Sequence, residues 1–160
     1  MKFLFSILAL VFTTKECENR KADIDSKKTE IVNIDRSSEQ EKDYIIEYSA
    51  VSRGTFKEIK INKTGVSVQK DRNSKPVVTE LNNEMREGLI NNLEEVDITM
   101  LPKLKAPTEK RFYDAAAHAT LKITVDGKTY STSSFDHGFP PEKIKSLCDK
   151  ILKISEETKE

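Results

Sequence analysis

Hydrophobic and polar residues alternate along several short stretches between residues 44 and 81, and this alternation predicts β-strands. Branched and aromatic side chains are frequent in these stretches, and polar turns containing glycine or asparagine separate them. The predicted strands are residues 44–51, 56–61 and 66–70, followed by a short extended piece at 76–81. Short polar connections between consecutive strands favour an antiparallel sheet.

The hydrophobic period changes from two to between three and four at residues 82–97, which predicts an α-helix. Asn82 or Asn83 is a suitable N-terminal cap. Gly88 lies inside this helix at a cost of about 1 kcal/mol relative to alanine, and we interpret it as a position of close approach to the sheet. The expected buried stripe consists of Met85, Leu89, Leu93 and Val96.

The segment from residue 115 to 135 predicts a β-hairpin around Asp126-Gly127, a pair that favours a type I′ turn. A two-residue loop fixes the strand register. The register places Val125 opposite Lys128, Ile123 opposite Tyr130, His118 opposite Phe135 and, by extension, Ala117 opposite Asp136. The face of Ala119, Leu121, Ile123, Val125 and Tyr130 is expected to point to the core, and that of His118, Thr120, Lys122 and Thr124 away from it.

A second helix is predicted from Pro140 or Pro141 to about Ser155, because proline suits a first helical turn. Its apolar stripe is Ile144, Leu147, Cys148, Ile151 and Ile154. The order of strands, helix, hairpin and helix predicts an α+β domain: an antiparallel β-sheet of about five strands with both helices packed on one face.

The N-terminus has a different character. Lys2 precedes an apolar run at residues 3–12 that is about half the length needed to cross a bilayer, so residues 1–16 are interpreted as a secretory signal peptide. A buried strand or helix is the alternative. Cys17 follows where bacterial lipoproteins place the cysteine that is acylated, although Glu16 is not the small residue such signals prefer. Acylation of Cys17, with attachment to a membrane, is the favoured expectation, and ordinary cleavage remains the alternative.

Residues 17–43 are expected to form a disordered, charged tether, because the segment from Lys15 to Asp43 contains 7 Lys/Arg and 9 Asp/Glu in 29 residues and no aromatic residue. Residues 44–158 then form one domain. If Cys17 is acylated or removed, no disulfide is possible. A bridge between Cys17 and Cys148 is the rival hypothesis in an oxidising compartment.

Composition and the absence of known motifs argue against several classes of function. The formal net charge is 0, so the chain lacks the overall basic field of nucleic-acid-binding proteins, and no nucleic-acid partner is expected. The sequence contains no P-loop, no G-x-G-x-x-G, no G-x-S-x-G and no H-E-x-x-H motif. No cofactor and no metal are therefore predicted.

The stretch "SSFDHGFPP" contains one of only two histidines. Asp136 and His137, with His118 nearby, could form a catalytic or metal-binding group in which the carboxylate orients the imidazole. The structural alternative is a turn in which Asp136 or His137 caps the following helix and Gly138 reverses the chain. We favour the structural alternative, because isolated histidines without ligand spacing are weak signals.

"KAPTEKRFYDAAAHA" (residues 105–119) is the better candidate for a binding surface. Arg111, Phe112, Tyr113 and Asp114 combine aromatic rings with charge immediately before a run of small residues. The segment can form a binding edge, or it can pack between its loop and the last helix, and the sequence leaves both open.

Taken together, the domain resembles small exported envelope proteins of unknown function from flavobacteria-like bacteria, through "KAPTEKRFYDAA", the Asp-Gly hairpin and "SFDHGFPP". More remotely, "YSAVSRGTFKEIKI" and "PPEKIKSLCDKI" are similar to emfourin-type inhibitors of thermolysin-like metallopeptidases. That similarity implies a contact at the turn of Arg53 and Gly54, although the chain lacks the Gly-Gly aromatic segment of that family.

The function expected from the sequence is a non-catalytic exported protein of the bacterial cell envelope, lipid-anchored in the periplasm or outer membrane, that binds a protein or a small ligand. An emfourin-like peptidase inhibitor is the alternative, and a small metal-binding or hydrolytic protein is the third hypothesis.

Overall fold

The computed structural model describes residues 43–158. The expectations for the signal peptide, for Cys17 and for the tether lie outside the described residues, apart from Asp43 at the very end of the tether.

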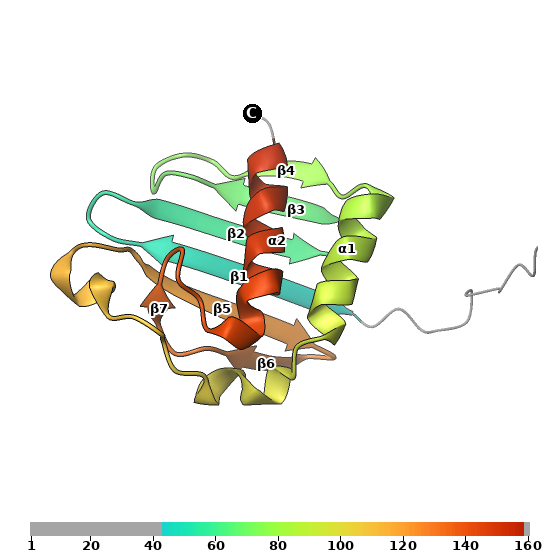
Figure 1. Cartoon of the computed structure of the whole chain (residues 1–160). Helices are drawn as coiled ribbons and strands as arrows, with labels where there is room; N and C mark the ends of the chain where they lie inside the picture. Colours follow the sequence, from blue (N-terminus) through green and yellow to red (C-terminus); the bar gives the residue numbers. More distant parts are fainter. Residues whose placement is uncertain (1–42, 159–160) are drawn as a thin grey trace, which may run out of the picture. The chain divides into compact units, whose positions relative to one another are not determined.

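An antiparallel sheet occupies the described part of the chain, with strand order β4-β3-β2-β1-β5-β6 and with β7 paired to β5 (Figure 1). Its strands are β1 (Tyr44–Val51), β2 (Phe56–Asn62), β3 (Gly65–Gln69), β4 (Val77–Glu80), β5 (His118–Val125), β6 (Lys128–Ser131) and β7 (Phe135–Asp136). Strands β1, β2 and β3 begin and end within one residue of the sequence-based expectation, whereas the strands of the hairpin, β5 and β6, are shorter than the predicted segment 115–135. The sheet has more strands than the five or so expected because the short pieces β4 and β7 also pair.

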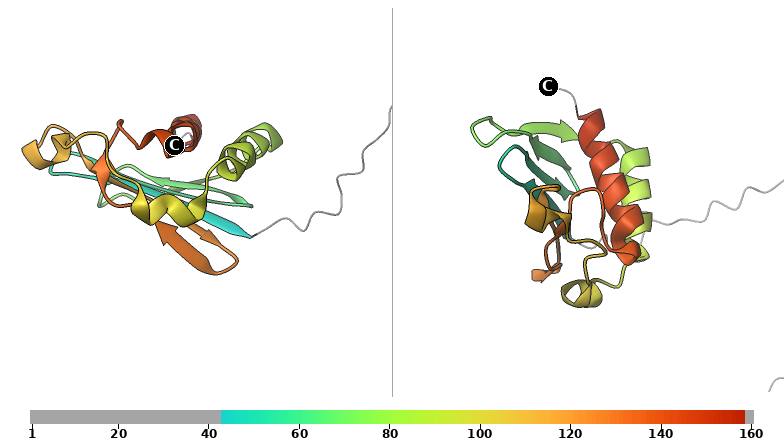
Figure 2. Two further views of the ribbon diagram at one scale, coloured as in Figure 1. Left: turned by 60° about the horizontal axis from the view of Figure 1, so that its bottom comes forward. Right: turned by 60° about the vertical axis from the view of Figure 1, so that its left-hand side comes forward.

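Two α-helices, α1 (Asn83–Glu94) and α2 (Lys145–Glu157), cover one face of this sheet (Figures 1 and 2). The predicted α+β class, with both helices on one face, is therefore confirmed. The connections also contain three short 3₁₀ helices that the sequence did not predict: η1 (Ile98–Lys103), η2 (Lys110–Tyr113) and η3 (Glu142–Ile144).

The core lies between the sheet and the helices, and strand alternation determines which side chains enter it. In β1 every second residue is buried, and the central ones, Ile46 and Tyr48, pair with buried residues of both β2 and β5. The stripe of α2 is buried as predicted, whereas in α1 only Leu89 is fully buried and the rest of its stripe packs at the margin. The buried members from the helices are Leu89, Ile144, Leu147, Cys148, Ile151 and Ile154.

The first helix is capped as expected, because the side chain of Asn82 accepts a hydrogen bond from the amide of Met85. Gly88 is a position of close approach, as interpreted from the sequence, but the prediction that it approaches the sheet is wrong. A Cβ built on Gly88 would lie 2.6 Å from Nζ of Lys150, so the residue faces α2 rather than the sheet.

The hairpin register is correct near the turn and wrong by one residue further away. Val125 pairs with Lys128 and Ile123 with Tyr130, but His118 pairs with Asp136 and Ala119 with Phe135. The connection from Thr132 to Ser134 contains one residue more than the facing part of β5. Thr132 anchors it, because its amide donates to the carbonyl of Leu121 and its hydroxyl accepts from the Leu121 amide.

The helical region near the C-terminus begins later than predicted. The chain forms η3 first and enters α2 at Lys145, and neither helix has a side-chain cap. The expectation that Asp136 or His137 caps this helix is therefore wrong. The carboxylate of Asp136 instead accepts hydrogen bonds from a different part of the chain.

Candidate functional site

The predicted site residues within the described part lie at one end of the sheet. Val51 pairs with both Phe56 and His118, and His118 pairs with Asp136. The turn of Arg53 and Gly54, the start of β5 and the loop after β7 therefore extend beyond the same strand ends. We call this the loop end of the sheet, comprising residues 52–57, 70–76, 108–117 and 136–141, on the left in Figure 1.

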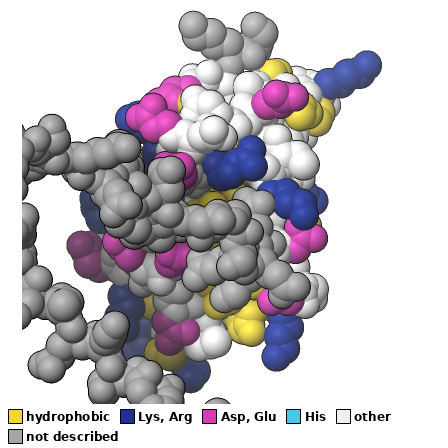
Figure 3. Space-filling view, turned by 90° about the vertical axis from the view of Figure 1, so that its right-hand side faces the viewer, with side chains coloured by type: hydrophobic (Ala, Val, Ile, Leu, Met, Phe, Trp, Pro, Cys, Tyr) yellow, Lys and Arg dark blue, Asp and Glu magenta, His cyan; other side chains and the backbone are white. Residues whose placement is uncertain are grey.

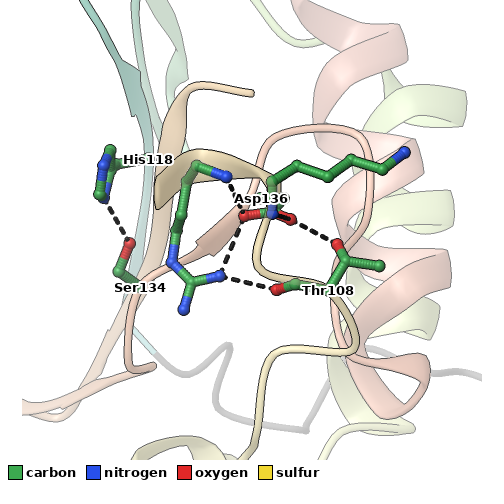
Figure 4. A network of polar contacts seen from close by, with 6 residues as sticks. Thr108, His118, Ser134 and Asp136 are labelled. Carbon is green, nitrogen blue, oxygen red and sulfur yellow. Dashed lines mark hydrogen bonds and ion pairs between the residues drawn. The ribbon is translucent and has the colours of Figure 1, made fainter. Parts of the chain in front are cut away.

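Asp136 is fully buried, and its carboxylate fixes the segment that leads into η2 (Figure 4). Oδ2 accepts from the hydroxyl of Thr108 at 2.5 Å and from the amide of Lys110 at 2.7 Å. Oδ1 accepts from the amide and from Nη1 of Arg111, both at 3.0 Å. Asp136 thus satisfies two amides in the first turn of η2, which is the capping role that sequence analysis assigned to a different helix.

The charge of Asp136 is stabilised by these donors. Burial alone would raise the pKa of the carboxyl, but the hydrogen bonds from Thr108, Arg111 and Lys110 outweigh burial and hold its pKa well below the usual value. The side chain of Arg111 is itself 9 % exposed, and its Nη1 also donates to the carbonyl of Thr108 at 2.7 Å. The pair forms a buried clamp between β7 and η2.

Large hydrophobic side chains are exposed where this clamp presents η2 to solvent. Tyr113 is 76 % exposed, Phe112 62 % and Phe139 43 %. Among residues 43–158 only one other large hydrophobic side chain, Val78, stands out as exposed in this way. We call Phe112, Tyr113 and Phe139 the aromatic platform, because clustered exposed apolar surface marks interaction sites in soluble domains.

Cations and a histidine join the rings of the aromatic platform to their surroundings. Nζ of Lys110 lies 3.7 Å from the ring centroid of Phe139, which connects the loop after β7 to η2. The guanidinium of Arg111 lies 4.2 Å from the ring of Phe112, whose other neighbour is the ring of His118 at 6.0 Å. These contacts orient the rings of Phe112 and Phe139, and Tyr113 lies next to Phe112 on η2.

His137 points in a different direction from Asp136. Its Nδ1 lies 2.8 Å from the hydroxyl of Tyr48, a buried residue of β1. Burial raises the pKa of Tyr48, so the hydroxyl keeps its proton. Burial and then the nearby charge of Lys57 lower the pKa of His137, which favours the neutral imidazole as the acceptor of that proton.

The structure does not assemble the catalytic or metal-binding group considered from the sequence. Asp136 is committed to Thr108, Lys110 and Arg111, and His118 lies near Ser134, with Nδ1 3.4 Å from Oγ (Figure 4). Neither histidine is oriented by Asp136. Within the described range, no group of three or more His, Cys, Asp or Glu residues is placed to hold a metal ion.

The remaining candidates are exposed at the loop end. Arg53 and Gly54 form the tip of the turn between β1 and β2. Asp114 ends η2 with a positive φ of 57°, and its amide donates to the carbonyl of Lys110. Within residues 105–119, Arg111 is packed, though against β7 rather than the last helix, whereas Phe112 and Tyr113 are exposed.

Sequence reasoning did not include Thr108, Lys110, Phe139 or Tyr48 among the site residues. Phe139 was detectable, because Gly138 and Pro140 on either side place it in a loop, and loops lie on the surface. The role of Tyr48 had no signal, since it occupies an ordinary inward position of a strand.

A concave feature separate from the aromatic platform lies on the face of the sheet that carries no helix. It is a shallow depression of about 350 Å³ with polar walls. Glu47 and Lys60 form an ion pair there at 3.5 Å, and both side chains are well exposed. Its lining includes Glu58, Lys122, Ser49, Ser67, Gln69 and Thr120. Mixed charge on an open sheet face is typical of a solvated surface.

Surface composition elsewhere is also mixed. In the view of the molecule's right-hand side, acidic, basic and hydrophobic side chains are interspersed where they are visible (Figure 3). Among the described residues no helix is long and apolar enough to span a membrane.

Comparison of the chain with protein-family models, with curated proteins and with solved structures finds no match.

Proposed function

We propose that this chain is an exported, non-catalytic binding protein of the cell envelope that contacts its partner through the aromatic platform. One observation carries the proposal: the buried carboxylate of Asp136 holds η2 so that Phe112 and Tyr113 remain exposed. A buried charge is costly unless it is fully paired. Its use here to hold a surface turn is readily explained if that turn has to be rigid.

Rigidity before binding is an advantage for a binding surface, because less conformational entropy is lost when the complex forms. Tyrosine, phenylalanine and arginine are also the residues enriched in the centres of protein interfaces. Both arguments favour a contact role for η2 over a role in catalysis.

Site-specific photocrosslinking tests this contact. Tyr113 is replaced by benzoylphenylalanine in cells that naturally make the chain, and Val78, which is 72 % exposed on β4, is replaced in parallel as the control. A specific adduct is expected from position 113 and none from position 78. Absence of an adduct at 113, or equal adducts at both positions, would exclude the platform as the contact surface.

Export and lipid anchoring are a separate part of the proposal and rest on the N-terminal pattern. Cells grown with a labelled fatty acid are expected to incorporate the label into this chain. Cys17→Ala is expected to abolish the label and release the chain from membranes, and unchanged membrane association of that variant would contradict anchoring at Cys17.

A peptidase inhibitor of the emfourin type is the second candidate, favoured by a property of Gly54. This glycine does not have a positive φ, and a Cβ built on it meets no atom within 4 Å, so the fold does not require glycine there. A partner's backbone lying close to this turn would require it. Titration of a thermolysin-like metallopeptidase with the purified protein decides: no inhibition with the protein in excess eliminates this candidate for that class.

A further inference from the structure

The loop end of the sheet is basic, although the chain as a whole has a formal net charge of 0. Its four segments contain seven Lys/Arg and four Asp/Glu residues, an excess of three positive charges when His137 is counted as neutral. Because Arg111 and Asp136 neutralise each other inside the domain, the excess belongs to exposed side chains.

These cations are available to a partner. Apart from Arg111, no cation of the loop end takes part in the ion pairs found within residues 43–158. Arg72 lies over the ring of Phe56 and Lys110 over that of Phe139, so both present their charge beside an aromatic surface. Arg53 is exposed in the turn between β1 and β2.

We infer that the partner is an acidic protein, with an apolar pocket that receives Tyr113 and carboxylates around it that face the cations of the loop end. The inference rests on the proposed function and adds the chemistry of the partner. In such an interface the buried aromatic side chain supplies most of the affinity, and the surrounding charges accelerate association and select the partner.

An anionic membrane is the other surface that attracts aromatic and basic residues, but two observations disfavour it. Asp114 follows Tyr113 directly and is exposed, so a carboxylate would accompany the ring into the headgroup region. The chain also enters the domain at Asp43, next to the end of β1 that pairs with Val125, which is the opposite end of the sheet from Tyr113. The segment that precedes the domain therefore joins it at the end of the sheet opposite to the aromatic platform.

The probe is a preparation of washed envelope fragments from cells that naturally make the chain but from which its gene has been deleted. The full chain is expressed from a plasmid in the same deletion cells, with Cys17→Ser in every variant so that no acyl group contributes to binding. Association and dissociation rates are measured on immobilised fragments at about 50 mM and about 500 mM salt, because the higher concentration screens surface charges. Fragments digested with a protease, and vesicles made from the extracted lipids, serve as the two comparison surfaces.

Two variants, each with a matched control, separate the contribution of the Tyr113 side chain from that of the surrounding positive charges. Tyr113→Ser is expected to raise the dissociation rate about tenfold, and Val78→Ser to leave it unchanged. The double charge reversal Arg53→Glu with Lys70→Glu is expected to lower the association rate about fivefold at low salt and little at high salt. Lys128→Glu with Lys153→Glu makes the same change in net charge outside the loop end and is expected to have a much smaller effect. All variants should keep the parent's melting temperature.

The outcomes distinguish the two levels of the proposal. If the fragments do not bind the protein, or if Tyr113→Ser binds as well as the parent, the proposed function itself fails. If Tyr113→Ser weakens binding but the two double reversals behave alike, the platform is a contact surface whose partner is not acidic. Binding that survives protease digestion and is reproduced by the lipid vesicles would replace the acidic protein by a membrane.

Discussion

The hydroxyl of Tyr48 and Nδ1 of His137 are hydrogen-bonded at 2.8 Å, although 89 positions separate the two residues in the chain. No other acceptor among the described residues reaches this buried hydroxyl, so the bond assigns the proton of the neutral imidazole to Nε2. The loop that carries Phe139 is thereby tied to the central strand of the sheet, and the tie depends on the protonation state of His137.

The first prediction concerns pH. The pKa of His137 is lowered in the folded protein, so the unfolded chain takes up a proton at higher pH than the folded protein does. The contribution of this bond to the free energy of unfolding should be fully present above the ordinary histidine pKa of 6.5 and should decrease as pH falls below it. Urea unfolding between pH 5 and pH 8 measures this. His137→Gln should flatten the dependence in that window, and an equally steep curve for this variant would contradict the assignment.

The second prediction concerns the buried clamp. Asp136→Ala removes the partner of a buried arginine as well as two helix-turn contacts, so the free energy of unfolding should fall by about 3–5 kcal/mol. This exceeds the usual cost of about 0.5–2 kcal/mol for a lost cap. Because the pKa of Asp136 is lowered, its stabilising contribution should be present above the ordinary value of 3.8 and lost as pH falls below it. Chemical denaturation checks the first statement, and acid titration of parent and Asp136→Asn the second. A loss below 1 kcal/mol for Asp136→Ala would contradict the clamp.

The third prediction compares two glycines at the loop end. Gly138 has a φ of 86°, so Gly138→Ala should destabilise the protein by about 1–2 kcal/mol even though a Cβ there meets no atom within 4 Å. Gly54 has the same open surroundings without the positive φ, and Gly54→Ala should be neutral or stabilise by up to about 1 kcal/mol. Thermal unfolding of the two variants side by side isolates the backbone conformation, and equal losses would show that φ is not the deciding difference.

The fourth prediction concerns Gly88 in α1. Alanine is favoured over glycine inside a helix by about 1 kcal/mol, and the only close atoms belong to the flexible end of Lys150, which can move into solvent. Gly88→Ala should therefore stabilise the protein by about 0.5–1 kcal/mol. A destabilised variant would mean that α1 and α2 approach more rigidly at this point, and Lys150→Ala in the same background would then restore stability.

Local pattern was sufficient to predict the sheet and both α-helices, because each reflects a period that one stretch of sequence contains by itself. Val125 and Lys128 were paired correctly for the same reason: the Asp-Gly turn is local. The pairing of His118 was missed because the extra residue depends on Thr132, whose hydroxyl takes the place of a strand carbonyl in receiving the Leu121 amide. Nothing in the hydrophobic pattern distinguishes that threonine from its neighbours.

The sequence named candidate site residues, but it did not reveal the contacts that these residues make. Asp136 was recognised as structural, yet its donors lie 25 to 28 positions earlier in the sequence and a sequence pattern cannot reveal them. The sequence hypothesis paired His137 with its neighbour Asp136. In an extended chain, however, the side chains of adjacent residues point to opposite sides. His137 therefore contacts Tyr48 on one side of this segment, and Asp136 contacts η2 on the other side.

The extra residue between Thr132 and Phe135 has a consequence for how this protein can vary. Paired residues of neighbouring strands share a face, so the offset is what turns Phe135 toward the helices and Asp136 toward η2. Deleting either Ser133 or Ser134 would make the two facing segments equal in length, so that Phe135 would pair with Ala119 and Asp136 with His118 in an uninterrupted register. Substitutions of these serines leave that arrangement intact. Natural variation at this connection should therefore be free in chemical identity, and loss of one of the two serines should be tolerated.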